Sequence, residues 1–154
     1  MSSFSVDFVF IPKTQDIYKK IRSKKIIINN KINIMCGKFR KGHFEGVVDV
    51  VERLLNIINP KYMFLGEKDF QQLFLIKKYV KNKFKVKIIP CKTIRDKNYV
   101  AFSSRNKLLS KNQFKIAGKI AKKLKKFKKK INTKDCLNKK INKFKMYLKN
   151  TYEI

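Results

Sequence analysis

The fold of this chain is decided by one stretch of its sequence, Tyr62-Met63-Phe64-Leu65-Gly66-Glu67-Lys68-Asp69-Phe70-Gln71-Gln72. The apolar run that opens it, residues 62–65, has the length and composition of a buried strand. A turn is predicted at residues 66–68, because glycine lets the backbone bend tightly. A helix is predicted over residues 69–81, with one side formed by Phe70, Leu73, Ile76, Lys77 and Val80. Strand, turn and helix in this order predict an α/β fold whose ligands bind at the carboxyl end of the strand.

The segments on either side of this stretch continue the alternation of strands and helices. From residue 44 to residue 58 apolar residues recur at helical spacing, and the pattern stops before Asn59-Pro60. Another strand is predicted at residues 86–90. Residues 91–106 are irregular and polar, which is typical of a functional loop. The alternation of buried strands and amphipathic helices predicts a parallel sheet.

The two ends of the chain carry weaker patterns. A buried strand is predicted at residues 6–11, a short helix capped by Thr14 at 14–21, and a hairpin from residues 26–28 and 32–34. After Ser110, a residue suited to a helix cap, a helix is predicted with an apolar face and a Lys-covered face; its apolar residues are Ile116, Ala117, Ile120, Ala121, Leu124 and Phe127. A last helix is predicted from about residue 134 to 149.

The turn after the predicted strand has side chains suited to an anion. The start of the following helix points free N–H groups at its surroundings, and Lys68 adds a mobile positive charge of the kind used for nucleotide phosphates. Gln72, one turn into the helix, could hydrogen-bond a substrate hydroxyl or carboxylate. A structural alternative exists, because Asp69 followed three residues later by Gln72 is a relative of the capping box, which satisfies the same N–H groups.

A second polar cluster lies in the predicted loop, Phe102-Ser103-Ser104-Arg105-Asn106. Two hydroxyls and an arginine form a combination suited to phosphate oxygens. Hydroxyls before a polar loop are also ordinary turn or cap residues, so the cluster alone leaves both interpretations open.

The charge of the chain is extreme, with 40 Lys and Arg against 10 Asp and Glu and a formal net charge of +30. Such a surface first suggests a polyanionic partner. The basic residues are nearly all lysine, however, and they accompany runs of Ile and Asn, the residues that an AT-rich coding bias enriches. Base-reading surfaces favour arginine for its planar fork, so we expect no specific nucleic acid.

The cysteines and the absence of long apolar runs indicate a cytoplasmic protein. Cys36, Cys91 and Cys136 are odd in number, widely spaced and without a C-x-x-C arrangement, which argues against zinc and against a disulfide framework. No apolar stretch approaches the roughly 20 residues that cross a bilayer, so no membrane partner is expected.

Taken as a pair, residues 66–72 and Ser103-Ser104-Arg105-Asn106 closely resemble two signatures of the pantothenate synthetase (pantoate-beta-alanine ligase) family. Arg40-Lys41-Gly42-His43-Phe44-Glu45-Gly46-Val47 resembles the family stretch just upstream. Residues 6–12 look like the strand before that. The resemblance runs from about residue 6 to residue 106 and continues more faintly to the end.

This resemblance implies an enzyme, an ATP-dependent acid-amine ligase that condenses pantoate with β-alanine through a pantoyl adenylate. It implies a partial Rossmann-like, nucleotidyltransferase-type domain over residues 1–110 and the start of a smaller, largely helical domain over 111–154. ATP would be a substrate, with Mg²⁺ held by residues outside this chain, and a homodimer is left open. The residues that would border ATP are Gly66, Glu67, Lys68, Asp69, Ile94, Phe102, Ser103, Ser104 and Arg105. Among these, Lys68 and Arg105 would be catalytic, and Gln72 would hold pantoate.

The sequence departs from the family pattern in specific places. The family has an amino-terminal His-x-Gly-His signature, whereas the single histidine here, His43, belongs to the Gly-His-Phe stretch. We therefore expect a fragment lacking that signature and the end of the carboxyl-terminal domain, with little activity by itself. Tyr99 stands where the family has glycine, which indicates a backbone angle that tyrosine adopts poorly.

One competing interpretation comes from another functional class. The Lys-covered helix over residues 115–130 would suit a Lys-rich nucleic-acid or anionic-surface binding module.

Overall fold

A computed structural model describes residues 5–19, 26–28, 34–131 and 137–152 of the 154-residue chain. The chain forms two compact units, Met1–Lys92 and Thr93–Ile154, which are described separately below. The division of domains after residue 110 stays a prediction, because compact packing alone does not define a domain.

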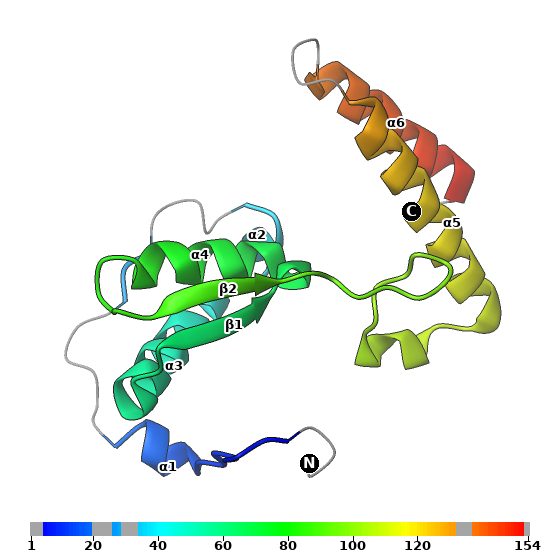
Figure 1. The fold of residues 1–154 in the computed structure, drawn as a ribbon. Helices are drawn as coiled ribbons and strands as arrows, with labels where there is room; N and C mark the ends of the chain where they lie inside the picture. The colour runs from blue at the N-terminus through cyan, green and yellow to red at the C-terminus, as the bar shows by residue number, and fades with distance from the viewer. Residues whose placement is uncertain (1–4, 20–25, 29–33, 132–136, 153–154) are drawn as a thin grey trace. The chain divides into compact units, whose positions relative to one another are not determined.

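The first unit is an α/β unit with a two-stranded parallel sheet (Figure 1). Its elements in order are α1 (Thr14–Ile17), α2 (Cys36–Phe39), α3 (His43–Ile58), β1 (Tyr62–Gly66), the 3-10 turn Glu67–Asp69, α4 (Phe70–Val80) and β2 (Lys87–Cys91). The strands pair in register from Tyr62 with Lys87 to Gly66 with Cys91. The predicted α/β class, parallel sheet and order of strand, turn and helix are confirmed.

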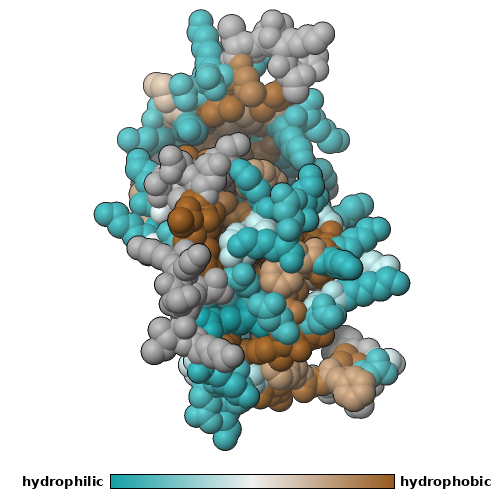
Figure 2. All heavy atoms as spheres, turned by 90° about the vertical axis from the view of Figure 1, so that its left-hand side faces the viewer, coloured by the Kyte–Doolittle hydropathy of each residue, from teal (hydrophilic) through white to brown (hydrophobic). Residues whose placement is uncertain are grey.

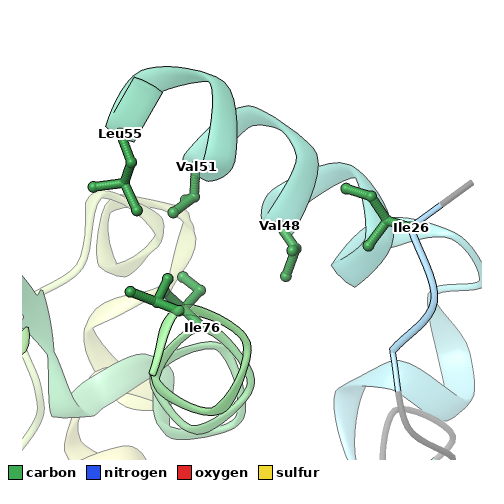
Figure 3. Close-up of a cluster of buried hydrophobic side chains, with 6 residues drawn as sticks. Ile26, Val48, Val51, Leu55 and Ile76 are labelled. Atoms are coloured by element: carbon green, nitrogen blue, oxygen red, sulfur yellow. The ribbon is translucent and has the colours of Figure 1, made fainter. Parts of the chain in front are cut away.

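The core of this unit lies between α3, α4 and one face of the sheet. The periodic apolar residues Val48, Val51 and Leu55 of α3 point toward Ile76 of α4, with Ile26 beside them (Figure 3). Met63, Leu65 and Ile88 pack against this cluster from the sheet. The residues that alternate with Met63 and Leu65 along β1 face the opposite side of the sheet, where Tyr62 and Phe64 are exposed. The expected burial of β1 therefore holds for one face only.

The ends of α3 follow from backbone conformation. Gly42 precedes the helix at a φ of +75°, in the left-handed region that glycine adopts without strain. Asn59 ends it, also in the left-handed region, and its N–H donates to the carbonyl of Leu55. Pro60 follows and prevents continuation, as the sequence predicts.

A polar contact fastens α1 to α3. Arg53 forms a salt bridge with Asp49 one turn earlier, at 3.0 Å, and its Nη1 donates to the carbonyl of Ile17. Its guanidinium also lies over the ring of Tyr18, 4.7 Å from the centroid. One charged side chain thus holds the end of the short helix.

The second unit contains a loop, a 3-10 turn and a helical hairpin. The turn is Ser104–Leu108, and the helices are α5 (Lys111–Lys130) and α6 (Leu137–Tyr152). Ser110 caps α5 as predicted, since its Oγ accepts from the N–H of Gln113 while the side chain of Gln113 accepts from the N–H of Ser110. Phe127 stacks on Phe144 at 4.0 Å between ring centroids, which joins the two helices.

Several predicted features near the amino terminus are wrong. Residues 6–11 form no strand, and Phe8 is 92% exposed. An apolar run becomes a strand only beside a pairing partner, and the described part of the chain offers none. Helix α1 ends at Ile17, and Thr14 is its first residue rather than its cap; Lys13 occupies the cap position. Residues 26–28 are not a strand, and residues 29–33 of the predicted hairpin lie outside the described residues.

Candidate functional site

The turn after β1 leaves open space. Gly66 has an extended backbone, with a φ of −71°, so its conformational freedom is not what the turn uses. No atom lies within 4 Å of the place where a Cβ would stand on Gly66. The absent side chain leaves room at the carboxyl end of the strand, where α/β folds bind their ligands.

The capping interpretation of the next residues is wrong. Asp69 occupies the cap position of α4, but its side chain makes no capping hydrogen bond. Within the described residues, the amide of Gln72 also has no hydrogen bond. Both side chains therefore remain available to a ligand.

These residues line a cavity of about 150 Å³ together with a second segment of the sequence. Lys68, Asp69 and Gln72 come from the turn and from the first part of α4. Arg40 and His43 come from the chain leading into α3. The remaining lining residues are Met35, Cys36, Phe44, Phe70 and Gln71. A guanidinium, an imidazole, an ammonium group and one carboxylate thus surround a space suited to a small anion.

Gln71 builds one wall of this cavity. Its side chain is 7% exposed, its Nε2 donates to the carbonyl of Ile34 at 2.7 Å, and its Oε1 accepts from the N–H of Gly37 at 3.3 Å. The segment before α3 is thereby fixed against α4. Because Gln71 and Gln72 are consecutive on a helix, one amide points into the protein while the other lines the cavity.

His43 is positioned from the start of α3. It is the first helical residue after Gly42, and its ring lies 5.0 Å from that of Phe44, which is 3% exposed. The buried phenylalanine anchors this turn of the helix beside the cavity.

The second predicted cluster lies in the second unit. Ile94 accepts a hydrogen bond from the N–H of Phe102 at 3.1 Å, and both side chains are mostly exposed. Ser103 caps the following 3-10 turn, since its Oγ accepts from the N–H of Arg105 at 3.3 Å. Ser103 thus has the cap role that the sequence left open, while Ser104 and Arg105 are exposed.

Tyr99 has the backbone conformation that its glycine-like position indicates. Its φ is +67°, in the left-handed region. The carbonyl of Tyr99 accepts from Nη1 of Arg95 at 2.9 Å, and Nζ of Lys125 lies over its ring at 3.8 Å from the centroid. A hydrogen bond with Lys125, together with the charge of its ammonium group, lowers the pKa of the Tyr99 phenol.

Other candidate chemistry is limited in the described part of the chain. Cys36 and Cys91 are free and exposed, while Cys136 lies outside the described residues. The described residues contain no group of three or more His, Cys, Asp or Glu side chains suited to a metal ion. A search of the same residues finds no helix both long and apolar enough to span a bilayer.

Comparison with known proteins connects this geometry to one family. The model of the family described as pantoate-beta-alanine ligase matches residues 1–153. The chain belongs to the pantoate-beta-alanine ligase family. The pantothenate synthetase of Caldicellulosiruptor bescii is 42% identical over 113 residues, covering 73% of this chain and 40% of that protein.

Solved structures of the family agree with the fold. The pantothenate synthetase of Thermus thermophilus superposes with a TM-score of 0.83 at 27% identity, covering 99% of this chain and 56% of that one. The pantoate-beta-alanine ligase of Francisella tularensis, complexed with beta-gamma ATP and beta-alanine, gives 0.70 at 38% identity, covering 94% and 54%. The chain therefore spans about half the length of these relatives, and the nucleotidyltransferase-type fold is confirmed.

The family finding gives no support to the competing binding module. Lysines cover much of α5, but hydrophilic residues are spread over the whole face that Figure 2 shows, with apolar residues between them. A Lys-covered face opposite an apolar face is the ordinary pattern of a surface helix, which is how we interpret α5.

The sequence predicted three of the ten residues that line the cavity, and the seven others include three with basic or amide side chains, Arg40, His43 and Gln71. Arg40 and His43 lie within the Arg40 to Val47 stretch that carries part of the family resemblance, so the resemblance itself was the signal. Gln71 is spaced i, i+4 from Leu75, which is 2% exposed, and that spacing places both on the buried side of α4.

Proposed function

We propose that this chain supplies ATP and pantoate contacts to a pantothenate synthetase. In that reaction the pantoate carboxylate attacks the α-phosphorus of ATP, the bond to pyrophosphate breaks, and pantoyl adenylate forms. The amine of β-alanine then attacks the acyl carbon, and AMP leaves. The adenylate intermediate is needed because a carboxylate resists attack by an amine until one of its oxygens belongs to a good leaving group.

One observation carries the proposal. Two sequence segments that separately resemble the family, residues 40–47 and 66–72, meet at a single cavity through Arg40, His43, Lys68 and Gln72. Its volume of about 150 Å³ is small for a drug-sized or nucleotide ligand and suits a small hydroxy acid. Basic side chains would attract the pantoate carboxylate, and the Gln72 amide would hydrogen-bond its oxygen atoms.

We further propose that ATP lies beside this cavity. Lys68, at its border, would neutralise the phosphates as negative charge develops, and Gly66, Glu67 and Asp69 would border the nucleotide. For the second unit, taken by itself, the family resemblance implies ATP contacts as well: Arg105, Phe102, Ser103 and Ser104 would contact phosphate oxygens, and Ile94 would offer a main-chain contact. Phosphoryl transfer of this kind depends mainly on positioning and charge neutralisation. The Francisella tularensis relative, whose structure holds beta-gamma ATP and beta-alanine, supports ATP as a substrate, whereas the residue assignments stay our proposal.

Magnesium is implied by the family chemistry. The carboxylate at the cavity is Asp69, and the described residues contain no cluster of three or more His, Cys, Asp or Glu side chains. We propose that the protein ligands of the Mg²⁺ lie outside this chain.

We place the reaction in the cytoplasm, with ATP, pantoate and β-alanine as the partners of the site. A homodimer is a compatible assembly. The free thiols of Cys36 and Cys91 are consistent with a reducing compartment.

Calorimetric titration of the chain with pantoate tests this proposal. We expect saturable binding, reduced about tenfold or more in Gln72→Leu, because the amide would donate and accept at the ligand. Acetate, which shares the carboxylate but lacks the hydroxyl groups, should bind more weakly. Equal weak binding of acetate and pantoate would contradict the proposal.

A further inference from the structure

The loop that precedes Ser103 is folded back on itself within the second unit. Arg95 and Ala101 form an antiparallel bridge, and the N–H of Asp96 donates to the carbonyl of Val100 at 2.9 Å. The carboxylate of Asp96 accepts from the N–H groups of Asn98 and Val100, at 2.9 and 2.8 Å. The loop is therefore a closed unit with a defined tip at residues 97–99.

The tip carries a conformational cost. The backbone of Tyr99 has a φ of +67°, a value that residues other than glycine rarely adopt. Such a conformation persists only where surrounding contacts favour it.

Two contacts of the tip reach helix α5. The Nζ of Lys125 lies over the Tyr99 ring at 3.8 Å from the centroid. About two turns earlier on the helix, Gly118 is buried against Asn98, and a Cβ built on Gly118 would lie 3.0 Å from the Asn98 Cβ. The loop is thus fastened to α5 by a cation over a ring and by a close backbone approach that a side chain at position 118 would crowd.

The same loop leads directly into the residues proposed to face ATP. The side-chain amide of Asn106 donates to the carbonyl of Ala101 at 3.0 Å, which ties the 3-10 turn to the loop exit. Ser103 lies between these two points and caps the turn that carries Arg105. The orientation of the turn therefore depends on where the loop is held.

We propose that Tyr99 and Lys125 are positioning residues for the loop at residues 95–101 and for the turn that follows it. Their contact holds the loop tip on α5, and the held loop presents Ser103 and Arg105 to the phosphates in one orientation. This inference rests on the proposed function for its ligand, but the holding contact itself is independent of any ligand.

Hydrogen exchange of the Asn98 and Val100 amides measures the holding contact. Lys125→Met should speed exchange of both about two- to fivefold, the range expected from losing an exposed cation over a ring. Lys125→Arg should restore slow exchange because arginine also places a cation there. Lys119→Met, on the same helix, should leave exchange unchanged. Unchanged exchange in Lys125→Met would overturn the proposal.

A double variant separates this contact from general weakening of α5. Once the ring is removed in Tyr99→Ala, adding Lys125→Met should increase exchange no further. A full additional increase of about two- to fivefold would overturn the pairing of these two residues. Tyrosine absorbance gives a second signature, since Lys125→Met should raise the lowered pKa of Tyr99 toward its ordinary value.

ATP titration separates the proposal from the proposed function. If the wild-type chain binds ATP and Lys125→Met weakens binding while Lys125→Arg restores it, the positioning role is supported. If exchange increases but ATP affinity is unchanged, the positioning role is overturned while the ATP site stands. If the wild-type chain binds no ATP, the proposed function is overturned, and the exchange data alone decide the loop contact.

Discussion

The side-chain amide of Gln71 donates a hydrogen bond to the main-chain carbonyl of Ile34, 2.7 Å away and 37 residues earlier in the sequence. With the bond it accepts from Gly37, this amide fixes the wall of the proposed pantoate cavity. The neighbouring amide of Gln72 lines the cavity itself. Gln71 thus has a structural role and Gln72 a proposed ligand-binding role, and substitutions can test the two roles separately.

Gln71→Leu should destabilise the chain without directly removing a ligand contact. It removes both hydrogen bonds of the Gln71 amide, at a cost of about 1–3 kcal/mol in the free energy of unfolding, although the Gly37 N–H keeps its 3.1 Å bond to the Ile34 carbonyl. Gln72→Leu is the matched control and should change that free energy by less than about 0.5 kcal/mol. Urea denaturation measures both. Equal destabilisation by the two variants would contradict the assigned roles.

Lys68→Met should weaken ATP binding. Loss of a charge-assisted contact to phosphate corresponds to about tenfold or more in affinity. Lys81→Met, just after α4 and exposed, should have little effect. The difference between the two variants should shrink as salt is added, because salt screens exposed charges. A Lys81 variant as weak as the Lys68 variant would indicate attraction by the net charge alone.

Tyr147 and Lys123 should titrate as a pair across the helical hairpin. Hydrogen bonding with Lys123 lowers the pKa of Tyr147 from its ordinary value of 10.0, and hydrogen bonding with Tyr147 raises the pKa of Lys123 from its ordinary value of 10.5. The stability from the lowered tyrosine pKa is lost as pH falls through it, and that from the raised lysine pKa is lost as pH rises through it. The pair should therefore favour the folded hairpin most between these two pKa values.

Tyrosine absorbance at increasing pH checks this pair. Lys123→Met should raise the pKa of Tyr147 toward the ordinary value, whereas Lys115→Met should not move it. A titration curve that is identical in the Lys123 variant and the wild type would refute the coupling.

Gly118→Ala should loosen the loop at residues 95–101 although alanine favours helices by about 1 kcal/mol. The new Cβ would lie 3.0 Å from the Asn98 Cβ and 3.3 Å from its carbonyl oxygen, and neither atom is the end of a flexible side chain. We expect faster exchange at Asn98 and Val100 with α5 itself no less protected. Slower exchange at both positions would show that the loop accommodates the methyl group.

Much of the first unit follows from the sequence because its signals are local. The spacing of Val48, Val51 and Leu55 predicts α3, and the apolar run before Gly66 predicts β1. The strand expected at residues 6–11 fails because pairing depends on a partner that no local pattern reveals. Phe70 fits the helical stripe of α4 and yet is 60% exposed, since burial depends on what packs outside the helix.

The site was predictable in part. Lys68 and Gln72 were predicted from the motif, and both line the cavity, while their ligand roles stay predictions. The contribution of Arg40 and His43 is a long-range contact between segments, which spacing along the sequence does not encode. The positive φ of Tyr99 was indicated only by the family resemblance, which implies glycine at that position.

The most direct test of the central claim is to follow ATP and pantoate titrations by amide NMR of the isotope-labelled chain. We predict that pantoate shifts the resonances of Lys68, Asp69, Gln72 and His43, and that ATP shifts residues 66–69 and 103–105. Ligand-induced shifts confined to the lysines of α5, or no shifts at residues 66–72 at saturating ligand, would contradict the account.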